Sequence, residues 1–466
     1  MPDVPFEWTW QGQQRHKNVR VNVPPSAAAE APVVVLVHGT SGDFNDMADP
    51  AVHPGFNVER IVEGTIRDRG WHAYPNAGWW SIGADPAVAV DGWKPFLNGR
   101  GFPTLNYSQD AARGRLAESA AELRRLLEVL EEQRTGNTHP GFAEVAARRI
   151  VLMGQSRGGV LARQVLVDLG AAGAAVLPRV TTCITLHAPN QGSNIANVAI
   201  ALDAATTPWR AAIERLPVDA ATKQALFGAL LGVVETIHAE AGAPAYLDYA
   251  VGSPVLAALA AAEPVPGVEY FTFGGTRPVL FNIRGWAFTA DSVLPQWHDP
   301  PFHWNTAYQT LLPIPPAIQA LPEVTPGAGD VLVAAAAARL PFSVHRDNYL
   351  NHAESLWDAA LKIQVVAILT GGPLPDPLVV GCMIPDATDP DRTLDGLGGA
   401  APSGGAWRLP LAEALALADR GHTLFVRRSD ERLVPLQRVR RRDGRRYLRS
   451  LPGAHGPRLH DLPRCP

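Results

Sequence analysis

One serine of this chain stands in a pattern that is typical of a nucleophile. Ser156 lies between Gly154 and Gly158 in a G-x-S-x-G motif. Four apolar residues at 150–153 predict a short strand buried on both faces, and apolar residues recur at helical spacing from 160 to 169. A strand, a tight turn and a helix form the context in which this motif exposes the serine hydroxyl. We therefore predict that Ser156 is a nucleophile and that Gly154 and Gly158 keep the turn free of side-chain collisions.

A serine hydroxyl is a weak nucleophile at neutral pH, so it needs an imidazole that accepts its proton. In the chain order serine, acid, histidine, the base belongs in a loop before the last amphipathic helix. His352 occupies that place, just before an expected helix over 354–370, and His345 is its nearest competitor. We predict His352 as the base.

The imidazole in turn needs a carboxylate that fixes its tautomer and stabilises its charged form. Asp330 lies 22 residues before His352, at the start of a segment that resembles a strand. Asp291 and Asp299 are alternatives in the preceding loop, whereas Asp347 is too close to His352 in sequence to come from a separate strand end. We predict Asp330 as the acid.

The oxyanion that forms on attack needs preorganised hydrogen-bond donors. The backbone N–H of Arg157, which follows the nucleophile, supplies one of them. The second is expected in the loop after an apolar strand at 33–37, where His38, Gly39 and Thr40 follow in sequence. We predict Thr40 as that donor, Gly39 as a turn residue and His38 as a residue that shapes the loop.

Strands alternate with helices at lengths that predict a doubly wound, mostly parallel sheet. The expected elements are strands at 19–23, 33–37, 71–74, 104–107, 150–153, 180–186 and 268–274, and helices at 109–133, 160–169 and 354–370. Residues 194–265 interrupt this rhythm with an Ala/Leu-rich helical stretch, which prolines at 208, 217, 244 and 254 are expected to divide into short pieces.

Five motifs in this order resemble the bacterial lipase and esterase branch of the α/β-hydrolase superfamily. They are V-V-V-L-V-H-G-T, G-Q-S-R-G-G, I-T-L-H-A-P-N-Q-G-S, G-S-P before Y-F-T-F-G, and G-D-V-L-V with N-H-A-E, and together they span about residues 32–370. The resemblance implies an α/β-hydrolase fold, Ser156, Asp330 and His352 as a triad, and 194–265 as a lid. The chain departs from the family at Gln155, where many lipases have His, and at Val331, where the family often has Gly.

The division expected from these patterns has four parts. Residues 1–31 form an N-terminal strand and linker, 32–193 and 266–373 form the α/β-hydrolase core, 194–265 form the helical lid, and 374–466 form a linker and a small β-rich module. The linker is expected at 385–406, followed by strands at 423–426, 433–439 and 447–451 with a turn at Asp443-Gly444. Residues 427–449 contain ten arginines but only three acidic residues. Such a basic ribbon is either a solvated sheet face or a surface that contacts anionic lipid.

Composition excludes several other classes of protein. A net charge of −4 argues against a nucleic-acid binder. The chain shows no signal peptide and no apolar run long enough to cross a membrane, which predicts a cytoplasmic protein or one exported by a signal-independent route. The three cysteines and the pair His298 and His303 fit no standard metal spacing, so no catalytic metal and no cofactor are expected.

The sequence therefore predicts a serine hydrolase that cleaves carboxylic esters through an acyl-enzyme. The apolar insertion favours lipid or long-chain acyl substrates. An acyltransferase with the same triad, a phospholipase effector that acts in a neighbouring cell and a small-ester esterase remain alternatives, and a non-catalytic binding protein is the last one.

Overall fold

The structure, a computed structural model, describes the core of the chain and separate strands beyond it. Described are residues 3–40, 42, 47, 92–214, 220–276, 283–288, 293–298, 321–324, 328–348, 350, 352, 354–356 and 359–374, followed by 380–384, 393–397, 423–427, 433–440 and 446–450. The strand expected at 71–74, the residues Asp291, Asp299 and His303, and the turn at Asp443-Gly444 lie outside the described residues.

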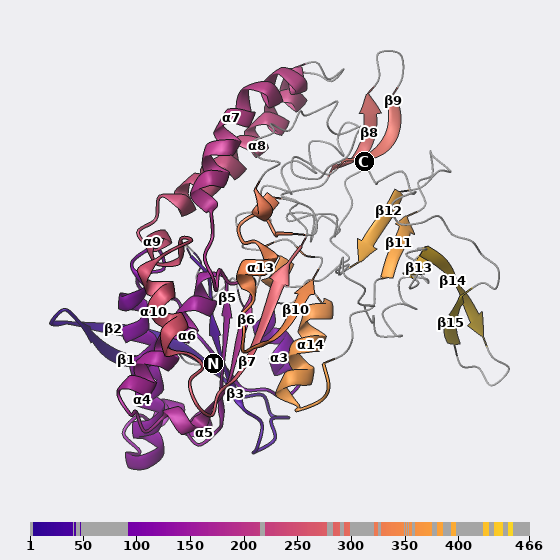
Figure 1. Cartoon of the computed structure of the whole chain (residues 1–466). Coiled ribbons are helices and arrows are strands. Elements are labelled where there is room, and N and C mark those ends of the chain that lie inside the picture. The colour runs from indigo at the N-terminus through magenta and orange to yellow at the C-terminus, as the bar shows by residue number, and fades with distance from the viewer. Residues whose placement is uncertain are drawn as a thin grey trace.

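An eight-stranded sheet runs through the core in the order β1-β2-β4-β3-β5-β6-β7-β10 (Figure 1). Its strands are β1 (Asp3–Trp10), β2 (Gln13–Asn22), β3 (Val33–Val37), β4 (Thr104–Asn106), β5 (Ile150–Gln155), β6 (Val180–Leu186), β7 (Glu269–Gly275) and β10 (Val344–Asn348). The hairpin β1–β2 pairs antiparallel with itself and with β4, and every pair from β4 to β10 is parallel. The prediction of a mostly parallel sheet is confirmed.

Helices cover both faces of this sheet, because the central strands are apolar on both sides. Alternate side chains of β3 belong to two separate core clusters, Val33, Val35 and Val37 to one and Val34 and Leu36 to the other. The first cluster packs under α4 (Leu116–Gly136) and α6 (Arg157–Ala171), and the second packs under α3 (Trp93–Asn98) and α14 (Ala359–Leu369). Figure 1 shows the two helical layers on either side of the strands.

The remaining described helices are short or belong to the insertion. They are η2 (Pro140–Phe142), α5 (Ala143–Ala146), η3 (Leu177–Arg179), α7 (Ile195–Glu214), α8 (Ala220–Ala241), α9 (Tyr246–Tyr249), α10 (Pro254–Ala262), η4 (Pro322–Val324), α13 (Ala335–Ala338) and η5 (Glu354–Leu356). A separate two-stranded ribbon joins β8 (Ile283–Phe288) to β9 (Val293–His298).

The helix expected from residue 109 begins later, at Leu116 in α4. Its N-terminus is capped from a distance, because the backbone N–H of Leu116 donates to Asp248 Oδ2 at 2.6 Å. Residues before it form turns, and among them the Gln109 side-chain amide donates to the His38 carbonyl at 2.7 Å. A cap that lies 132 residues away in the chain leaves no signal in the local sequence.

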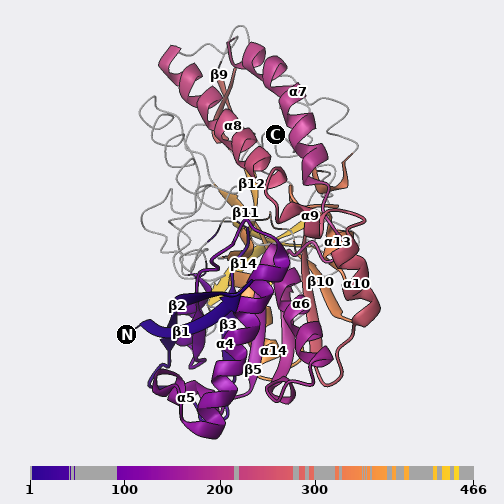
Figure 2. The same cartoon turned by 90° about the vertical axis from the view of Figure 1, so that its left-hand side faces the viewer.

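The insertion contains two long helices, α7 and α8, followed by the short α9 and α10, so the expected short pieces are found after Pro244 and from Pro254 but not at Pro208. The helix α7 runs for 20 residues through Pro208, and α8 runs for 22 residues beside it. A proline in a helix interior removes one backbone hydrogen bond, but packing against a neighbouring helix stabilises the remainder. The pair extends beyond the carboxyl end of the sheet (Figure 2).

The segment around Asp330 was expected to be a strand and is instead a turn, held by the Asp330 side chain. Asp330 Oδ1 accepts hydrogen bonds from the backbone N–H groups of Leu332 at 3.1 Å and Val333 at 2.8 Å. A short acidic side chain that bonds to the following backbone competes with strand pairing. The last helix of the core is also shorter than expected, since η5 and α14 are two separate pieces.

Beyond residue 374 the described strands form a sheet of their own. Its order is β12-β11-β13-β14-β15, with β11 (Val380–Ile384), β12 (Thr393–Leu397), β13 (Thr423–Arg427), β14 (Leu433–Arg440) and β15 (Arg446–Ser450). The strands β13 to β15 coincide with three expected strands. The expected linker at 385–406 contains β12, so that prediction was wrong for residues 393–397, which pair with β11.

Candidate active site

Ser156 lies at the sharp turn between β5 and α6. Its φ is 55° and its ψ is −131°, a backbone conformation that L-residues rarely adopt. The backbone N–H of Ser156 donates to the Leu186 carbonyl at 2.9 Å, which ties the turn to the carboxyl end of β6. The serine is therefore held in a strained position at the end of a buried strand, as a nucleophile elbow requires.

The two glycines of the motif are required by close packing of the backbone. A Cβ on Gly154 would lie 2.2 Å from the Gly158 carbonyl oxygen, and a Cβ on Gly158 would lie 2.3 Å from the Val37 carbonyl oxygen. A side chain at Gly154 would push β5 away from α6, and one at Gly158 would push α6 away from β3. Gly39, in the loop after β3, lies beside the nucleophile, because a Cβ there would be 3.5 Å from Ser156 Oγ.

His352 and Asp330 meet as a buried pair at the same edge of the sheet. His352 Nδ1 lies 3.0 Å from Asp330 Oδ2, and the backbone N–H of His352 donates to the Asp330 carbonyl at 3.0 Å. Since a carboxylate can only accept, Nδ1 carries the proton and Nε2 is left as the acceptor. The Gln155 side-chain amide donates to the His352 carbonyl at 3.4 Å, so the residue before the nucleophile contacts the loop of His352.

The Asp330 carboxylate is ionised at neutral pH and stays ionised well into the acidic range. Its burial would by itself raise its pKa, but the charge and hydrogen bond of His352 and the nearby imidazole of His187 lower that pKa to about 2. Both of its oxygens are engaged, one by the backbone turn and one by His352. The carboxylate can therefore hold an imidazole in one tautomer and stabilise its protonated form.

The competing histidine is engaged elsewhere. His345 lies on β10, where its Nδ1 is 2.7 Å from Thr272 Oγ1 and its Nε2 is 2.9 Å from Asp347 Oδ1. Both ring nitrogens are thus bound to side chains of the sheet edge. His345 therefore pairs with Asp347, whereas His352 pairs with Asp330.

The loop after β3 is fixed by His38, which acts as a structural residue. The backbone N–H of Gln109 donates to His38 Nε2 at 2.9 Å, so Nε2 carries no proton. His38 Nδ1 lies 2.9 Å from the Gly39 carbonyl, and the Gln109 amide donates to the His38 carbonyl at 2.7 Å. His38 is fully buried, in agreement with the predicted loop-shaping role.

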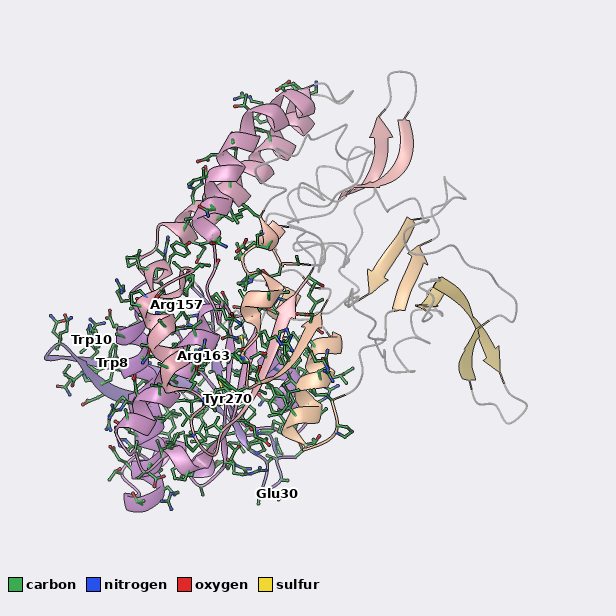
Figure 3. The ribbon with its side chains drawn as sticks, in the orientation of Figure 1. Trp8, Trp10, Glu30, Arg157, Arg163 and Tyr270 are labelled. Carbon is green, nitrogen blue, oxygen red and sulfur yellow. The ribbon has the colours of Figure 1, made fainter. Side chains whose placement is uncertain are left out.

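The two predicted oxyanion donors, Thr40 and Arg157, are anchored by their side chains. Thr40 Oγ1 lies 3.1 Å from the Tyr249 hydroxyl on α9. The buried Arg157 guanidinium, labelled in Figure 3, donates to Gln109 Oε1 and to Ser119 Oγ, the latter at 3.0 Å. Burial lowers the pKa of Arg157 from its ordinary value. Gln109 therefore connects the loop of Thr40 to the first residue of α6.

A second imidazole that the sequence analysis did not single out reaches the same carboxylate. His187 follows β6, and its Nδ1 lies 3.0 Å from Asp330 Oδ2. Its ring is 6.3 Å from that of His352 between centroids. The signal available in the sequence was its place directly after a buried strand next to β5, where the carboxyl ends of parallel strands meet.

Backbone strain is concentrated at these loops. Among the described residues other than glycine, five have positive φ, and three of them are Ser156, His187 and Val331, the last directly after Asp330. Each of these conformations costs on the order of 1–3 kcal/mol and persists only where the surrounding structure enforces it. Within the described part of the chain, His187, Asp330 and His352 are also the one group of three residues whose ligand atoms are close enough for a metal ion.

Solved structures of bacterial hydrolases are similar to this chain at low identity. The mature lipase of Bacillus licheniformis is 14% identical, over 75% of this chain and 97% of the lipase, with a TM-score of 0.40. A probable hydrolytic enzyme of Pseudomonas aeruginosa is 13% identical, over 79% and 94% of the two chains, with a TM-score of 0.33. A thermophilic esterase of Thermogutta terrifontis is 12% identical, over 79% and 96%, with a TM-score of 0.30.

No family model and no curated protein matches the chain in sequence. At these identities the structural likenesses are too distant to transfer an activity to this chain. Among the helices that the structure describes, none combines the length and the apolar character needed to cross a membrane.

Proposed function

We propose that this protein is a serine hydrolase that cleaves carboxylic esters through an acyl-enzyme. The observation that carries the proposal is the buried hydrogen bond of 3.0 Å between His352 Nδ1 and Asp330 Oδ2, beside the strained elbow of Ser156. It leaves His352 Nε2 as a base, because Nδ1 keeps its proton and donates it in the hydrogen bond to Asp330.

The proposed reaction has two halves. Ser156 Oγ attacks the ester carbonyl carbon while His352 Nε2 takes the hydroxyl proton, and the same proton then goes to the departing alcohol. Water repeats the sequence on the acyl-enzyme, with His352 again taking and returning one proton, and releases the acid. Asp330 stays ionised throughout and stabilises the imidazolium.

The backbone N–H groups of Thr40 and Arg157 are assigned as the hydrogen-bond donors that stabilise the negative charge on the carbonyl oxygen. Support for this assignment is the place of Gly39 next to Ser156 Oγ and the N-terminal position of Arg157 on α6. A helix N-terminus favours negative charge, and the anchored side chains of both residues hold the donors in place. Preorganised donors of this kind stabilise the transition state without reorganisation.

Apolar side chains near the site favour a long acyl chain over a small polar group. Val331 and Leu350 flank the Asp330–His352 pair in sequence and belong to one apolar cluster with residues of the insertion, namely Ile195, Val198, Val234 and Ile237. We propose that α7 and α8 form a lid over this cluster and that the substrate is a lipid or another long-chain ester.

A series of p-nitrophenyl esters from acetate to palmitate tests the proposal. We expect turnover that rises with acyl length and falls at least about a thousandfold in Ser156→Ala. Ser343→Ala, whose hydroxyl bonds to Thr272 and the Leu340 carbonyl on the sheet edge, serves as the matched control and is expected to retain activity. A phosphonate ester probe followed by mass spectrometry of the labelled peptide is expected to identify Ser156.

Other outcomes correspond to the remaining alternatives. Turnover of the shortest esters alone would indicate a small-ester esterase, and faster release of p-nitrophenol in the presence of an added alcohol, with an ester as product, would indicate an acyltransferase. Equal activity in Ser156→Ala would contradict the proposal. A phospholipase effector role, a cytoplasmic location and contact of the basic segment at 427–449 with an anionic membrane surface stay predictions.

A further inference from the structure

His187 presents a buried imidazole that hydrogen bonding does not explain. Its side chain is 0% exposed, and neither ring nitrogen has a hydrogen-bond partner among the residues that the structure describes. Nδ1 approaches Asp330 Oδ2 to 3.0 Å, but the direction of this approach does not make a hydrogen bond. A buried polar group without a partner points to a functional role or to an ion or water that satisfies it.

The backbone holds His187 in this place against its own conformational preference. Its φ is +50°, in the left-handed region, and its backbone N–H donates to the Phe273 carbonyl at 2.8 Å. A histidine in this conformation persists only where the surroundings enforce it. The fold therefore fixes the imidazole beside Asp330.

We propose that His187, Asp330 and His352 bind a divalent transition-metal ion of the Zn²⁺ type, and that the bound ion inhibits the enzyme. One ligand atom from each residue lies within 4.8 Å of the other two, and both Nδ1 atoms are 3.0 Å from Asp330 Oδ2. Zn–N bonds of about 2.0–2.1 Å in a tetrahedral arrangement place neighbouring ligands roughly 3.3 Å apart. The two distances from Asp330 Oδ2 to the Nδ1 atoms, each 3.0 Å, would need to lengthen by only a few tenths of an ångström.

The donor set selects the class of ion. Two imidazole nitrogens and one carboxylate oxygen suit Zn²⁺ and similar transition metals, whereas Ca²⁺ and Mg²⁺ prefer all-oxygen sites. Three protein ligands leave a fourth position for water. Binding displaces the Nδ1 proton of His352 to solvent.

Inhibition follows from the role of His352, and this step rests on the proposed function. With its Nδ1 on the ion, His352 no longer donates to Asp330, and the positive ion beside it opposes protonation of Nε2. The imidazole then cannot take the Ser156 proton.

The test compares Zn²⁺ binding with Zn²⁺ inhibition in the full-length protein after treatment with a chelator. Calorimetry is expected to show one strong Zn²⁺ site, and the loss of p-nitrophenyl ester turnover is expected to follow the same binding curve and to reverse with chelator. Mg²⁺ is expected to have neither effect. In His187→Asn, which tolerates positive φ, Zn²⁺ should bind at least about tenfold more weakly, and its inhibition should weaken by the same factor relative to the variant's own metal-free rate.

Two further variants keep the result interpretable. His345→Asn removes the histidine that pairs with Asp347 and should leave Zn²⁺ affinity unchanged, while Asp330→Asn should lose the site by calorimetry whatever its turnover. Thermal unfolding verifies that each variant is folded. Absence of a Zn²⁺ site, an unchanged affinity in His187→Asn, or activation by Zn²⁺ would overturn the inference. Calorimetric binding without any ester turnover would instead contradict the proposed function and retain the metal site.

Discussion

At the scale of single residues, the pairs His352–Asp330 and His345–Asp347 have similar lengths of 3.0 and 2.9 Å but different surroundings. The pair His352–Asp330 is buried, and its carboxylate has a pKa lowered to about 2. The pair His345–Asp347 lies on the edge strand β10, where the Asp347 side chain is 35% exposed. The buried pair lies beside the loop of Ser156, where the Gln155 side-chain amide donates to the His352 carbonyl at 3.4 Å, so the two pairs give a matched comparison.

Replacing Asp330 should abolish most turnover, because an amide no longer fixes the tautomer of His352 or stabilises its charged form. We expect kcat to fall by about four orders of magnitude in Asp330→Asn, with a much smaller change in KM. The measurement is steady-state hydrolysis of the ester preferred by the wild-type protein. Asp347→Asn is the control and should stay close to wild-type activity. Equal losses in the two variants would mean that Asp330 has no special role.

At the scale of elements, α6 carries two buried arginines that connect the elbow to distant segments (Figure 3). Arg157 donates to the Gly114 carbonyl at 3.2 Å and to Ser119 Oγ at 3.0 Å, which joins the start of α6 to α4. Arg163 binds Glu263 at 2.5 Å and the Asn190 carbonyl at 2.9 Å, which joins its middle to the end of α10 and the loop after β6. The helix that positions Ser156 is thus fixed along its length.

Breaking the buried ion pair should destabilise the fold, because the Arg163 charge would remain buried without its partner. The side chains of Arg163 and Glu263 are 1% and 0% exposed. Glu263→Gln is expected to lower the free energy of unfolding by about 3–5 kcal/mol, measured by urea denaturation. Glu128→Gln, which breaks a pair with Arg124 at 38% and 31% exposure, should cost less than about 1 kcal/mol. Similar losses in both variants would show that burial does not govern the Arg163–Glu263 pair.

At the scale of the whole molecule, a buried carboxyl on α4 makes stability depend on pH. Glu122 accepts a hydrogen bond from the Asp110 backbone N–H at 3.0 Å, and Lys17 Nζ on β2 is 3.9 Å from its other oxygen. Burial raises its pKa from 4.5 to about 7, against the lowering effects of the Asp110 hydrogen bond and of Lys17. The folded protein thus holds a proton that the unfolded chain releases at lower pH.

Stability falls with rising pH because the pKa of Glu122 is higher in the folded protein than in the unfolded chain. Below pH 4.5 both states are protonated at Glu122, and between 4.5 and about 7 the unfolded state ionises first, so stability falls as pH rises. The difference between the two pKa values corresponds to roughly 3 kcal/mol. We expect Glu122→Gln to gain roughly 2–3 kcal/mol relative to wild type between pH 5 and pH 8, measured by urea denaturation at each pH. For Glu128→Gln, the difference in unfolding free energy from wild type should not change with pH. If the difference for Glu122→Gln were also independent of pH, the raised pKa of Glu122 would be contradicted.

Local patterns in the sequence determined the elements that meet at the site. The apolar runs at 33–37 and 150–153 predicted two central strands, and G-x-S-x-G predicted the turn of Ser156, because strand burial and close backbone approach constrain neighbouring residues directly. The chain order proposed His352 and Asp330 together, and the structure places them within hydrogen-bond distance. Their catalytic roles, and those of Thr40 and Arg157, stay predictions.

Contacts between distant segments were decided only by the tertiary structure. Asp248 caps α4 across 132 residues, His187 reaches Asp330 from another strand end, and α7 continues through Pro208 while it packs against α8. None of these interactions has a fixed separation along the sequence, since each depends on how the sheet brings separate loops to one edge. The sequence alone determines which residues can do the chemistry, and the packing of the sheet determines which of them meet.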